Sequence, residues 1–588
     1  MEDICSLPKT YLLFIMKLHL PKLLCAALIA ALAIIGTSKV QAVEVVENVG
    51  CVDTSKTDAA HTIIDASTKD VTVGKGQAAG AFITDDEGNA KLITSFGSYK
   101  YDTYTKELTT TGTISNHLKV EGKLTINDDG QVYLGGQVRI VRNGSGVRDS
   151  YSGLIADSVE INGDGSVTNL NVGTATIGTL TINSGSANIH TTGTPSGSSS
   201  SAPNVGTDCK IAKINKALNV NGGTLSMGYA SKASSGTSHY QTYFAKGASI
   251  NQTGGTIKIA AQAFLAEGVT INQSGGSFST PETAYGQMEF ALSKGTYNLN
   301  QTNSEQGGSS PTFEVKRLAS AISTSLFNKF SPDAFNISQT ADNGTISLTT
   351  GTSVTGNKKF TLSSTSSLNQ NTVNGKINFG GDFSGASYNI DQKGSGTINI
   401  LSGCTFNAAS VDLISTAKLN VSGNLTINGD MAFTALSDDS AAIVMGTSGN
   451  LSMSEAEVSL SISLAEASMY NSMVTAAIEN EEGIFTIDLI SGLSGTDAAE
   501  LQALIDNGAL TLGENVELLT TSSALALAAD TEETRVYTGF NITSVTGTAL
   551  QVVDGKLQAV VSVSVPEPTT ATLSLMALAA LAARRRRK

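Results

Sequence analysis

The chain has 588 residues, a formal net charge of −14, 59 glycines and no tryptophan. Apolar residues make up 40% of it, which suffices for a folded core and excludes global disorder. An acidic chain is repelled by nucleic acid and by anionic lipid, so we expect no nucleic-acid partner.

Residues 1–42 have the pattern of an export signal. A basic region with Lys17 precedes an apolar stretch over 23–35, and small residues lead up to Ala42. This order predicts a signal peptide over 1–42 that a signal peptidase cleaves after Ala42. The alternative is an N-terminal membrane helix that is retained.

The exported part is strongly acidic and poor in cysteine. Residues 43–564 hold 28 basic and 48 acidic side chains, a formal charge of −20. Cys51, Cys209 and Cys404 are too widely spaced for a zinc ribbon or a dense disulfide framework. Three isolated buried thiols are the preferred interpretation, and one disulfide with one free thiol is the alternative.

One phrase recurs along the chain: an apolar residue, Asn or Ser, Gln or a small polar residue, a turn with Gly, and then alternating apolar residues. Clear copies begin at Ile250, Ile271, Ile337, Leu368 and Ile390, and looser ones at Leu124, Leu180, Leu218 and Leu419. Each copy reads as two short strands around a turn, where Gly and Asn supply positive φ. Copies start about 20–40 residues apart, a period typical of solenoids.

The repeat predicts a mainly β fold, with a right-handed parallel β-helix (a solenoid) over residues 43–435. Ile, Leu and Val are expected to point inward, and Asn and Thr to stack in ladders. A string of antiparallel hairpins is the alternative, because Asn343-Gly344 and Asn374-Gly375 are typical hairpin turns. The pattern is similar to that of bacterial passenger and adhesin solenoids.

Two segments interrupt the repeats. Thr192 to Pro203 is rich in Gly, Ser and Pro and predicts a flexible loop or linker. A second segment has apolar residues at helical spacing and predicts one amphipathic helix that covers an edge of the solenoid. Its apolar residues are Val315, Leu318, Ala319, Ile322, Leu326 and Phe330, and Pro332 ends the run. A membrane or partner role for this helix is the alternative.

After residue 435 the pattern changes, and residues 436–564 predict a small C-terminal cap domain, either α+β or a β-sandwich. We expect strands at 458–464 and 484–490, and a hairpin over 550–563 that turns at Asp554-Gly555. A helix over 497–506 is predicted with Thr496 as its N-cap and Gly508 as its terminator. Such a domain would protect the open end of a solenoid.

The sequence contains no recognisable catalytic or metal-binding pattern. The exported histidines, His61, His117, His190 and His239, lie far apart. The acidic clusters at Asp85-Asp86-Glu87, Asp128-Asp129 and Glu481-Glu482 lack a calcium-loop spacing and fit solvated turns better. Arg139, Arg142 and Arg148 lie near Asp149 and fit a salt-bridged surface strand. We therefore expect no enzyme, no cofactor and no metal site.

Two alternatives to a non-catalytic role stay open. A carbohydrate-active β-helix enzyme, a polysaccharide lyase or hydrolase, would place carboxylates on adjacent coils. An ice- or glycan-binding solenoid would use threonine ladders, and T-x-T spacing occurs at Thr111, Thr174 and Thr192.

The last residues combine an extended triplet, a short apolar run and a cluster of cations. They are Pro566, Glu567 and Pro568, the run over 571–583, the arginines Arg584, Arg585, Arg586 and Arg587, and Lys588. The run would form a helix of about 20 Å, short against a bilayer core of about 30 Å, and its cations would stay on the cytoplasmic side. This tail resembles the PEP-CTERM sorting signal of Gram-negative bacterial exoproteins. The resemblance implies removal by an exosortase; an uncut anchor is the alternative.

These features predict an exported, non-catalytic, structural or adhesive protein of the cell envelope or extracellular matrix. The predicted partners are a signal peptidase, an exosortase-like processing enzyme, the membrane through the tail over 565–588 before processing, and extracellular polysaccharide. The expected route is a transient tether at the inner membrane, followed by the outer surface or the extracellular space. Hydrophobic helices are expected at both termini.

Overall fold

The computed structural model describes residues 62–564, except for gaps at 67–69, 76–77, 81, 85–89, 93–99, 103–107, 110–115, 135–136, 142–146, 152, 166–167, 173, 190–211, 228–240, 260–261, 281–289, 306–308, 321–331, 351, 354–355, 358, 415, 436–441, 465–468, 470–472, 474–482 and 520–543. The predicted signal peptide, both terminal hydrophobic helices and the linker at Thr192 to Pro203 lie outside the described residues. Within the described residues, no helix is both long and apolar enough to cross a membrane.

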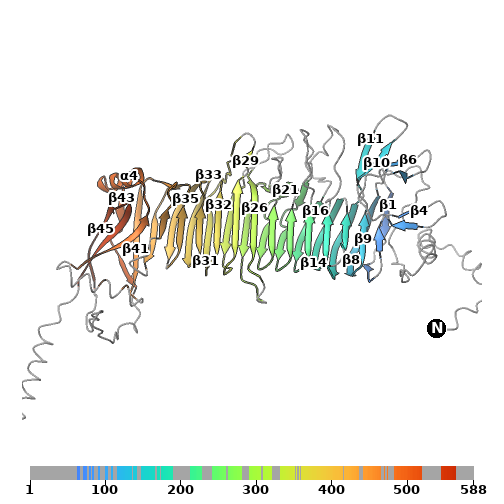
Figure 1. Ribbon diagram of the computed structural model, residues 1–588, viewed down its shortest axis with the longest axis horizontal. Helices are drawn as coiled ribbons and strands as arrows, with labels where there is room; N and C mark the ends of the chain where they lie inside the picture. The colour runs from blue at the N-terminus through green and yellow to red at the C-terminus, as the bar shows by residue number, and fades with distance from the viewer. Residues whose placement is uncertain are drawn as a thin grey trace, which may run out of the picture. The chain divides into compact units, whose positions relative to one another are not determined.

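The described chain is mainly β and divides into two compact units. Unit 1 comprises Met1–Tyr297 and Ser304–Phe330, and unit 2 comprises Asn298–Asn303 and Ser331–Lys588. In both units most strands pair in parallel with strands that lie one repeat later in the sequence (Figure 1). Each unit is described separately below.

Unit 1 is built from three parallel ladders. Their strands are β1 (Thr62–Ala66), β2 (Val71–Val73), β3 (Ala78–Gly80), β8 (Asn116–Asp128), β9 (Gln131–Leu134), β12 (Gly153–Gly163), β13 (Leu170–Val172), β14 (Thr174–Ser184), β15 (Ser186–Ile189), β16 (Ala212–Val220), β17 (Thr224–Met227), β18 (Gln241–Phe244), β19 (Ser249–Gln252), β20 (Thr256–Ile259), β21 (Gln262–Leu265), β22 (Thr270–Gln273), β23 (Ser277–Thr280), β24 (Phe290–Leu292) and β26 (Thr312–Ala319). The strand β25 (Thr296–Gln301) is shared by the two units.

In the ladders of unit 1, similar side chains stack on one another from strand to strand. In one of them, Leu124, Val159, Leu180 and Leu218 are successive Cα partners, and all four are buried. On each strand, the residues next to these four face outward, because successive side chains of a strand point to opposite faces. Burying each such aliphatic side chain contributes about 1.5–3 kcal/mol, so the repeated apolar positions fix the register.

Two small sheets, one antiparallel and one mixed, also belong to unit 1. One pairs β4 (Phe82–Thr84) with β5 (Ala90–Leu92). The other contains β6 (Lys100–Asp102), β7 (Leu108–Thr109), β10 (Gln137–Val141) and β11 (Val147–Tyr151), with β10 and β6 parallel.

Unit 2 repeats the same arrangement of parallel ladders. Its strands are β27 (Ala334–Gln339), β28 (Thr345–Thr350), β31 (Ser366–Thr372), β32 (Lys376–Gly380), β33 (Asp382–Gly394), β34 (Thr397–Ile400), β35 (Thr405–Ile414), β36 (Lys418–Val421), β37 (Asn424–Ile427), β38 (Met431–Ala435), β39 (Ile443–Met445), β40 (Asn450–Met453), β41 (Ala456–Ser463), β42 (Ile484–Ser491), β43 (Leu510–Leu512), β44 (Glu517–Leu519), β45 (Ser544–Val553) and β46 (Lys556–Ser564). A short antiparallel pair, β29 (Thr352–Ser353) and β30 (Gly356–Asn357), lies apart from the ladders.

The core of unit 2 is richer in aromatic residues. Tyr388 stacks on Phe406, with ring centroids 5.3 Å apart and planes 17° from parallel. Phe379 and Phe383 meet edge to face at 5.2 Å. All four side chains are fully buried. They supply a large buried apolar area between β32 and β35, since an aromatic side chain buries about 150–250 Å².

Unit 2 ends in an antiparallel set. The strand β42 pairs in parallel with β39 at one edge and antiparallel with β46 at the other, and β46 pairs antiparallel with β45. The helix α4 (Gly495–Asp506) packs against this set and against β40 (Figure 1). The strands expected at 458–464 and 484–490 are confirmed as β41 and β42.

The helix expected over 497–506 is confirmed, but its predicted cap is wrong. Ser494, not Thr496, is the N-cap: its hydroxyl accepts from the backbone N–H of Asp497, whose carboxylate accepts from Ser494 in return. This reciprocal pair is a capping box, which satisfies backbone amides at the start of the helix. Thr496 cannot be the N-cap because it already lies inside the helix. Gly508 follows at φ +76° and ends the helix as expected.

The hairpin expected at Asp554-Gly555 is confirmed. Both residues have positive φ, +51° and +71°, and β45 and β46 pair antiparallel on either side. Two consecutive positive φ angles match the twist of a two-residue hairpin.

The alternative of repeated antiparallel hairpins is wrong. Asn343 and Asn374 do have positive φ, but the strands around Asn343 pair elsewhere: β27 pairs in parallel with β31, and β28 with β32. The turn therefore joins two faces of one coil. In this parallel arrangement the inward residues of both strands, such as Ile337 in β27 and Ile346 in β28, are fully buried.

The predicted amphipathic helix is wrong over its first part. Val315, Leu318 and Ala319 lie in β26, which pairs in parallel with β23 and β24. The tertiary ladder overrides helical spacing here, because Phe313 and Val315 alternate inward and stack on β23. Ile322, Leu326 and Phe330 lie outside the described residues.

Parallel pairing continues beyond residue 435. The strand β38 pairs with β41, and β39 pairs with β42. The domain boundaries predicted at 42/43, 435/436 and 564/565 stay predictions.

Candidate functional site

The residues predicted to carry sorting and processing lie outside the described residues. They are Ala42, Pro566, Glu567, Pro568, Arg584, Arg585, Arg586 and Arg587. The structure does describe the strand that leads directly to the tail, and it describes two kinds of polar row that cross the coils.

The strand β46 is held on both edges up to its end. Ser564 is the Cα partner of Ser544 in β45, and Ser562 is the partner of Ile484 in β42. The backbone N–H of Val563 donates to the backbone oxygen of Gly483 at 2.9 Å. Leu557, Ala559, Val561 and Val563 are buried on the inner face. The body therefore stays folded up to the first residues of the tail.

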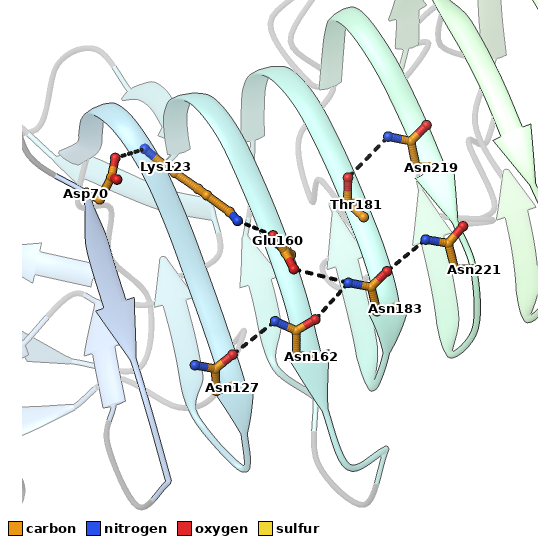
Figure 2. Close-up of polar contacts among 9 residues, drawn as sticks. All are labelled: Asp70, Lys123, Asn127, Glu160, Asn162, Thr181, Asn183, Asn219 and Asn221. Atoms are coloured by element: carbon orange, nitrogen blue, oxygen red, sulfur yellow. Dashed lines mark hydrogen bonds and ion pairs between the residues drawn. The ribbon is translucent and has the colours of Figure 1, made fainter.

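An outward row of asparagines crosses four coils of unit 1 (Figure 2). Asn162 donates to Asn127 at 3.0 Å, Asn183 to Asn162 at 2.8 Å, and Asn221 to Asn183 at 2.7 Å. Each Asn follows the last buried aliphatic residue of its strand, so its side chain points outward. Each side-chain nitrogen donates to the Asn of the preceding coil, so all the bonds of the row point the same way. Each side-chain carbonyl oxygen has a second lone pair for a ligand or water.

A second row runs beside the first. Asn219 donates to Thr181 at 3.2 Å, Asn251 to Asn219 at 2.8 Å, and Asn272 to Asn251 at 2.9 Å. At the start of the row, Glu160 forms an ion pair with Lys123 (Figure 2). The hydrogen bond from Lys123 lowers the pKa of the Glu160 carboxyl. The two rows present a polar surface of amides and hydroxyls.

Unit 2 carries an equivalent row. Asn378 donates to Ser347 at 3.0 Å, Asn399 to Asn378 at 2.8 Å, and Asn420 to Asn399 at 2.8 Å. These residues are Cα partners on β28, β32, β34 and β36. The expected asparagine ladder is therefore present in each unit.

Buried glutamines form rows on the inner face. In unit 1, Gln273 donates to Gln252 at 3.0 Å. In unit 2, Gln339 donates to Gln301 at 2.7 Å, Gln370 to Gln339 at 2.8 Å, and Gln392 to Gln370 at 2.9 Å. Each of these donating amides also reaches backbone oxygens beyond the turn, as Gln370 does at Gly375 and Thr397. The glutamines thus tie each turn shut and each coil to the next.

These glutamine rows are the polar feature that the sequence interpretation missed. The signal was the Gln at the third place of the phrase, as at Gln252, Gln273 and Gln339, which was grouped with small polar residues. Its side chain is buried, so it belongs to the core pattern. The structure also shows that Leu299-Asn300-Gln301 is a further copy of the recurring phrase, which the sequence pattern alone did not reveal.

The carboxylates of the described residues form one notable pair. Asp391 and Asp412 are Cα partners on β33 and β35. Partial burial, and then the charge of Asp391, raise the pKa of the Asp412 carboxyl. Among the described residues no group of three or more His, Cys, Asp or Glu side chains is placed to hold a metal ion.

Other predicted groups are placed only in part. Arg139 lies opposite Asp149 across the antiparallel pair β10 and β11, and Arg142 lies outside the described residues. Cys404 is buried and forms no disulfide within the described chain. Burial, with the charge of Asp382, raises the pKa of its thiol to about 12, so the group stays protonated. Cys51 and Cys209 lie outside the described residues.

Comparison with known proteins identifies the tail. The model of the PEP-CTERM protein-sorting motif matches residues 564–588. Comparisons with curated proteins and with solved structures gave no match. The match begins at Ser564, the last residue of β46. The motif implies export and processing by an exosortase-like enzyme. The chain therefore carries a PEP-CTERM sorting motif, which indicates sorting to the cell surface by an exosortase system.

Proposed function

We propose that the chain is a non-catalytic structural or adhesive protein whose outward amide rows contact extracellular polysaccharide. After cleavage of the signal peptide at Ala42, the tail tethers the protein to the inner membrane for a short time. An exosortase-like enzyme then removes the tail and releases the body to the outer surface. The observation that carries this proposal is the pair of asparagine rows in unit 1 on a chain with a surface-sorting motif.

The fold that we propose for each unit is a right-handed parallel β-helix. Three parallel ladders with partners one coil apart support it, as does the inward stack of Ile337, Leu368, Ile390 and Val411. Right-handed crossovers between parallel strands are the general rule for L-amino acids. An experimental structure with left-handed coils would overturn this part.

The polar rows suit a hydroxyl-rich ligand. Asn183, Asn221 and Asn272 are exposed, and each lies one coil from its row partner, which is about 4.8 Å in a parallel ladder. A regular row of carbonyl and amide groups can bond many hydroxyls weakly at once. Repeated weak contacts on one rigid surface add up to strong attachment by multivalency.

Cell fractionation tests the route. In a host with an exosortase-like enzyme, the full chain should reach the cell surface or the medium, while a chain that ends at Ser564 should follow a different route. Pro566→Ala with Pro568→Ala should retain the protein at the inner membrane, and Thr569→Ala is the matched control. Equal distribution of all four forms would sink the sorting proposal.

A binding assay tests the adhesive role. Purified residues 43–564 should sediment with the host's extracellular polysaccharide, and the triple change Asn183→Ala, Asn221→Ala and Asn272→Ala should weaken sedimentation at least threefold. The control removes the exposed ion pair of Lys246 and Glu267, which lies off the rows. Equal loss in both variants would show that the rows are not the binding surface.

The non-catalytic part of the proposal is tested at Asp391 and Asp412. A polysaccharide lyase or hydrolase on this fold would need such a pair of carboxylates on adjacent coils. We expect no new reducing ends or unsaturated products from extracellular polysaccharide. Products that vanish with Asp412→Asn would establish the enzyme instead.

A further inference from the structure

We propose that the end of β46 restricts access to the tail, so that the processing enzyme can act only after the last residues of β46 leave β42 and β45. This inference rests on the proposed removal of the tail. It adds a physical coupling between the fold of the C-terminal set and the rate of processing.

The first step of the argument is the position of the motif. The matched motif starts at Ser564, and Ser564 is still paired with Ser544. Pro566 is two residues further on, so its Cα lies at most about 7 Å from that of Ser564. In the sequence only Val565 lies between the paired Ser564 and the triplet that we propose the enzyme recognises.

The second step is the distance to the membrane. The apolar run starts at Ala571, seven residues beyond Ser564, which is at most about 25 Å of extended chain. Part of this extended length is needed to cross the headgroup region, which is about 5–7 Å thick on each side of the hydrocarbon core. While the tail is inserted, the folded end of β46 must stay close to the bilayer. The enzyme has to reach Pro566 to Pro568 inside that narrow gap.

The third step is the occupancy of both edges of β46. An extended peptide is commonly bound as an added strand, through its free N–H and C=O groups. Those groups in β46 already bond β42 on one side and β45 on the other. The N–H of Val563 also bonds the oxygen of Gly483, the residue just before β42. The enzyme therefore cannot bind the residues upstream of Val565 in this way until the strand opens. Strand ends are the parts of a sheet that open most readily.

The fourth step is the strength of the restraint. Val561 and Val563 are 0% and 4% exposed, so opening the strand end also exposes apolar surface. If only one tenth of the molecules have an open strand end at any time, processing is ten times slower than in a chain that is always open. Removal of the tail by hydrolysis breaks one peptide bond: water supplies the hydroxyl of the new carboxyl end, and its other hydrogen goes to the nitrogen of the released tail, which becomes an amino group.

The coupling is tested on the full chain, reconstituted in vesicles with the exosortase-like enzyme. One variant carries a spacer, and another carries a reducible disulfide, which we call a staple. Six Gly and Ser residues inserted between Ser564 and Val565 should speed tail removal about tenfold. A disulfide made by Ser544→Cys with Ser564→Cys should slow it about tenfold, and reductant should restore the unstapled rate. The control staple, Val553→Cys with Lys556→Cys, joins Cα partners at the closed end of the hairpin and should leave the rate unchanged.

The outcomes separate this inference from the proposed processing. If the tail is removed at one rate from the wild type, the spacer form and the oxidised staple, the coupling is wrong while processing stands. If no form loses its tail, processing and coupling both fail. Formation of each disulfide is checked by mass, and folding of each variant by thermal unfolding, so that a slow rate is assigned to the staple alone.

Discussion

The side-chain nitrogen of Gln370 donates a 2.8 Å hydrogen bond to the side-chain oxygen of Gln339, which lies 31 residues earlier in the chain. Both side chains are buried. A buried amide is costly unless it is bonded, and here the same nitrogen also reaches the backbone oxygens of Gly375 and Thr397. The glutamine row is thus a set of bonds that water cannot replace.

Gln370→Leu should destabilise unit 2 by about 2–4 kcal/mol. The change removes the donor to the buried side-chain oxygen of Gln339 and one of the acceptors of Gln392. It also removes the donor that Gln370 gives to the backbone oxygens of Gly375 and Thr397. Urea unfolding of residues 43–564 measures the loss.

The matched control lies on the outward row. Asn399 bonds Asn378 and Asn420 in the same fashion, but water can reach this face. Asn399→Ala should cost less than about 1 kcal/mol. A similar loss in both variants would contradict the distinction between inner and outer rows.

Tyr388→Phe should stabilise unit 2 by about 1–2 kcal/mol. The hydroxyl of Tyr388 is buried and has no hydrogen-bond partner within the described residues, and burial raises its pKa. Phe keeps the stacking on Phe406 and removes the unsatisfied group. Differential scanning calorimetry should show a higher Tm; a fall would show that the hydroxyl has a partner.

Asp412→Asn should stabilise the protein at neutral pH by up to about 0.5 kcal/mol. A raised pKa means that the folded chain holds this proton more tightly than the unfolded chain does, so ionisation of Asp412 lowers stability as pH rises from about 4. The gain should vanish at pH 3, where both forms are neutral. Tm as a function of pH measures it, with exposed Glu455→Gln as the control for loss of one charge.

Asp497→Ala should cost about 2–3 kcal/mol. The buried carboxylate accepts from the hydroxyl of Ser494 at 2.8 Å and from the backbone N–H of Leu451 at 3.1 Å, so it caps α4 and joins the helix to β40. Asp497→Asn retains one oxygen acceptor and should lose less than half as much. Equal losses in urea unfolding would argue against the link to Leu451.

Much of the fold could be predicted from the repeated phrase. The alternation around Ile250, Ile271 and Ile390 indicated inward columns and outward asparagines, because a strand has a period of two. It could not tell parallel from antiparallel pairing, since Asn343 takes the same positive φ in either arrangement. The helix expected from Val315 to Phe330 failed at β26 because its spacing also fits a strand whose neighbours decide its state.

The polar rows were predictable only in part. Asparagine rows follow from the outward phase of the phrase, whereas Gln370 has the same phase as the core and its polarity hid that. The partners of Asp497 could not be predicted, because Leu451 lies 46 residues away and their contact depends on how α4 packs. The tail is the opposite case, since the motif is contiguous and the match to residues 564–588 needs no fold.

Two neighbouring coils of unit 1 are nearly copies of each other, at an offset of 21 residues. Asn251 and Asn272 are Cα partners, Gln252 bonds Gln273, and a Cβ atom at Gly276 would overlap the backbone oxygen of Gly255. Because each coil bonds the next through the same groups, a gene that duplicates these 21 codons in frame encodes an added coil with all its contacts ready. Unequal recombination between these two coils would therefore lengthen or shorten the protein by one whole coil of 21 residues.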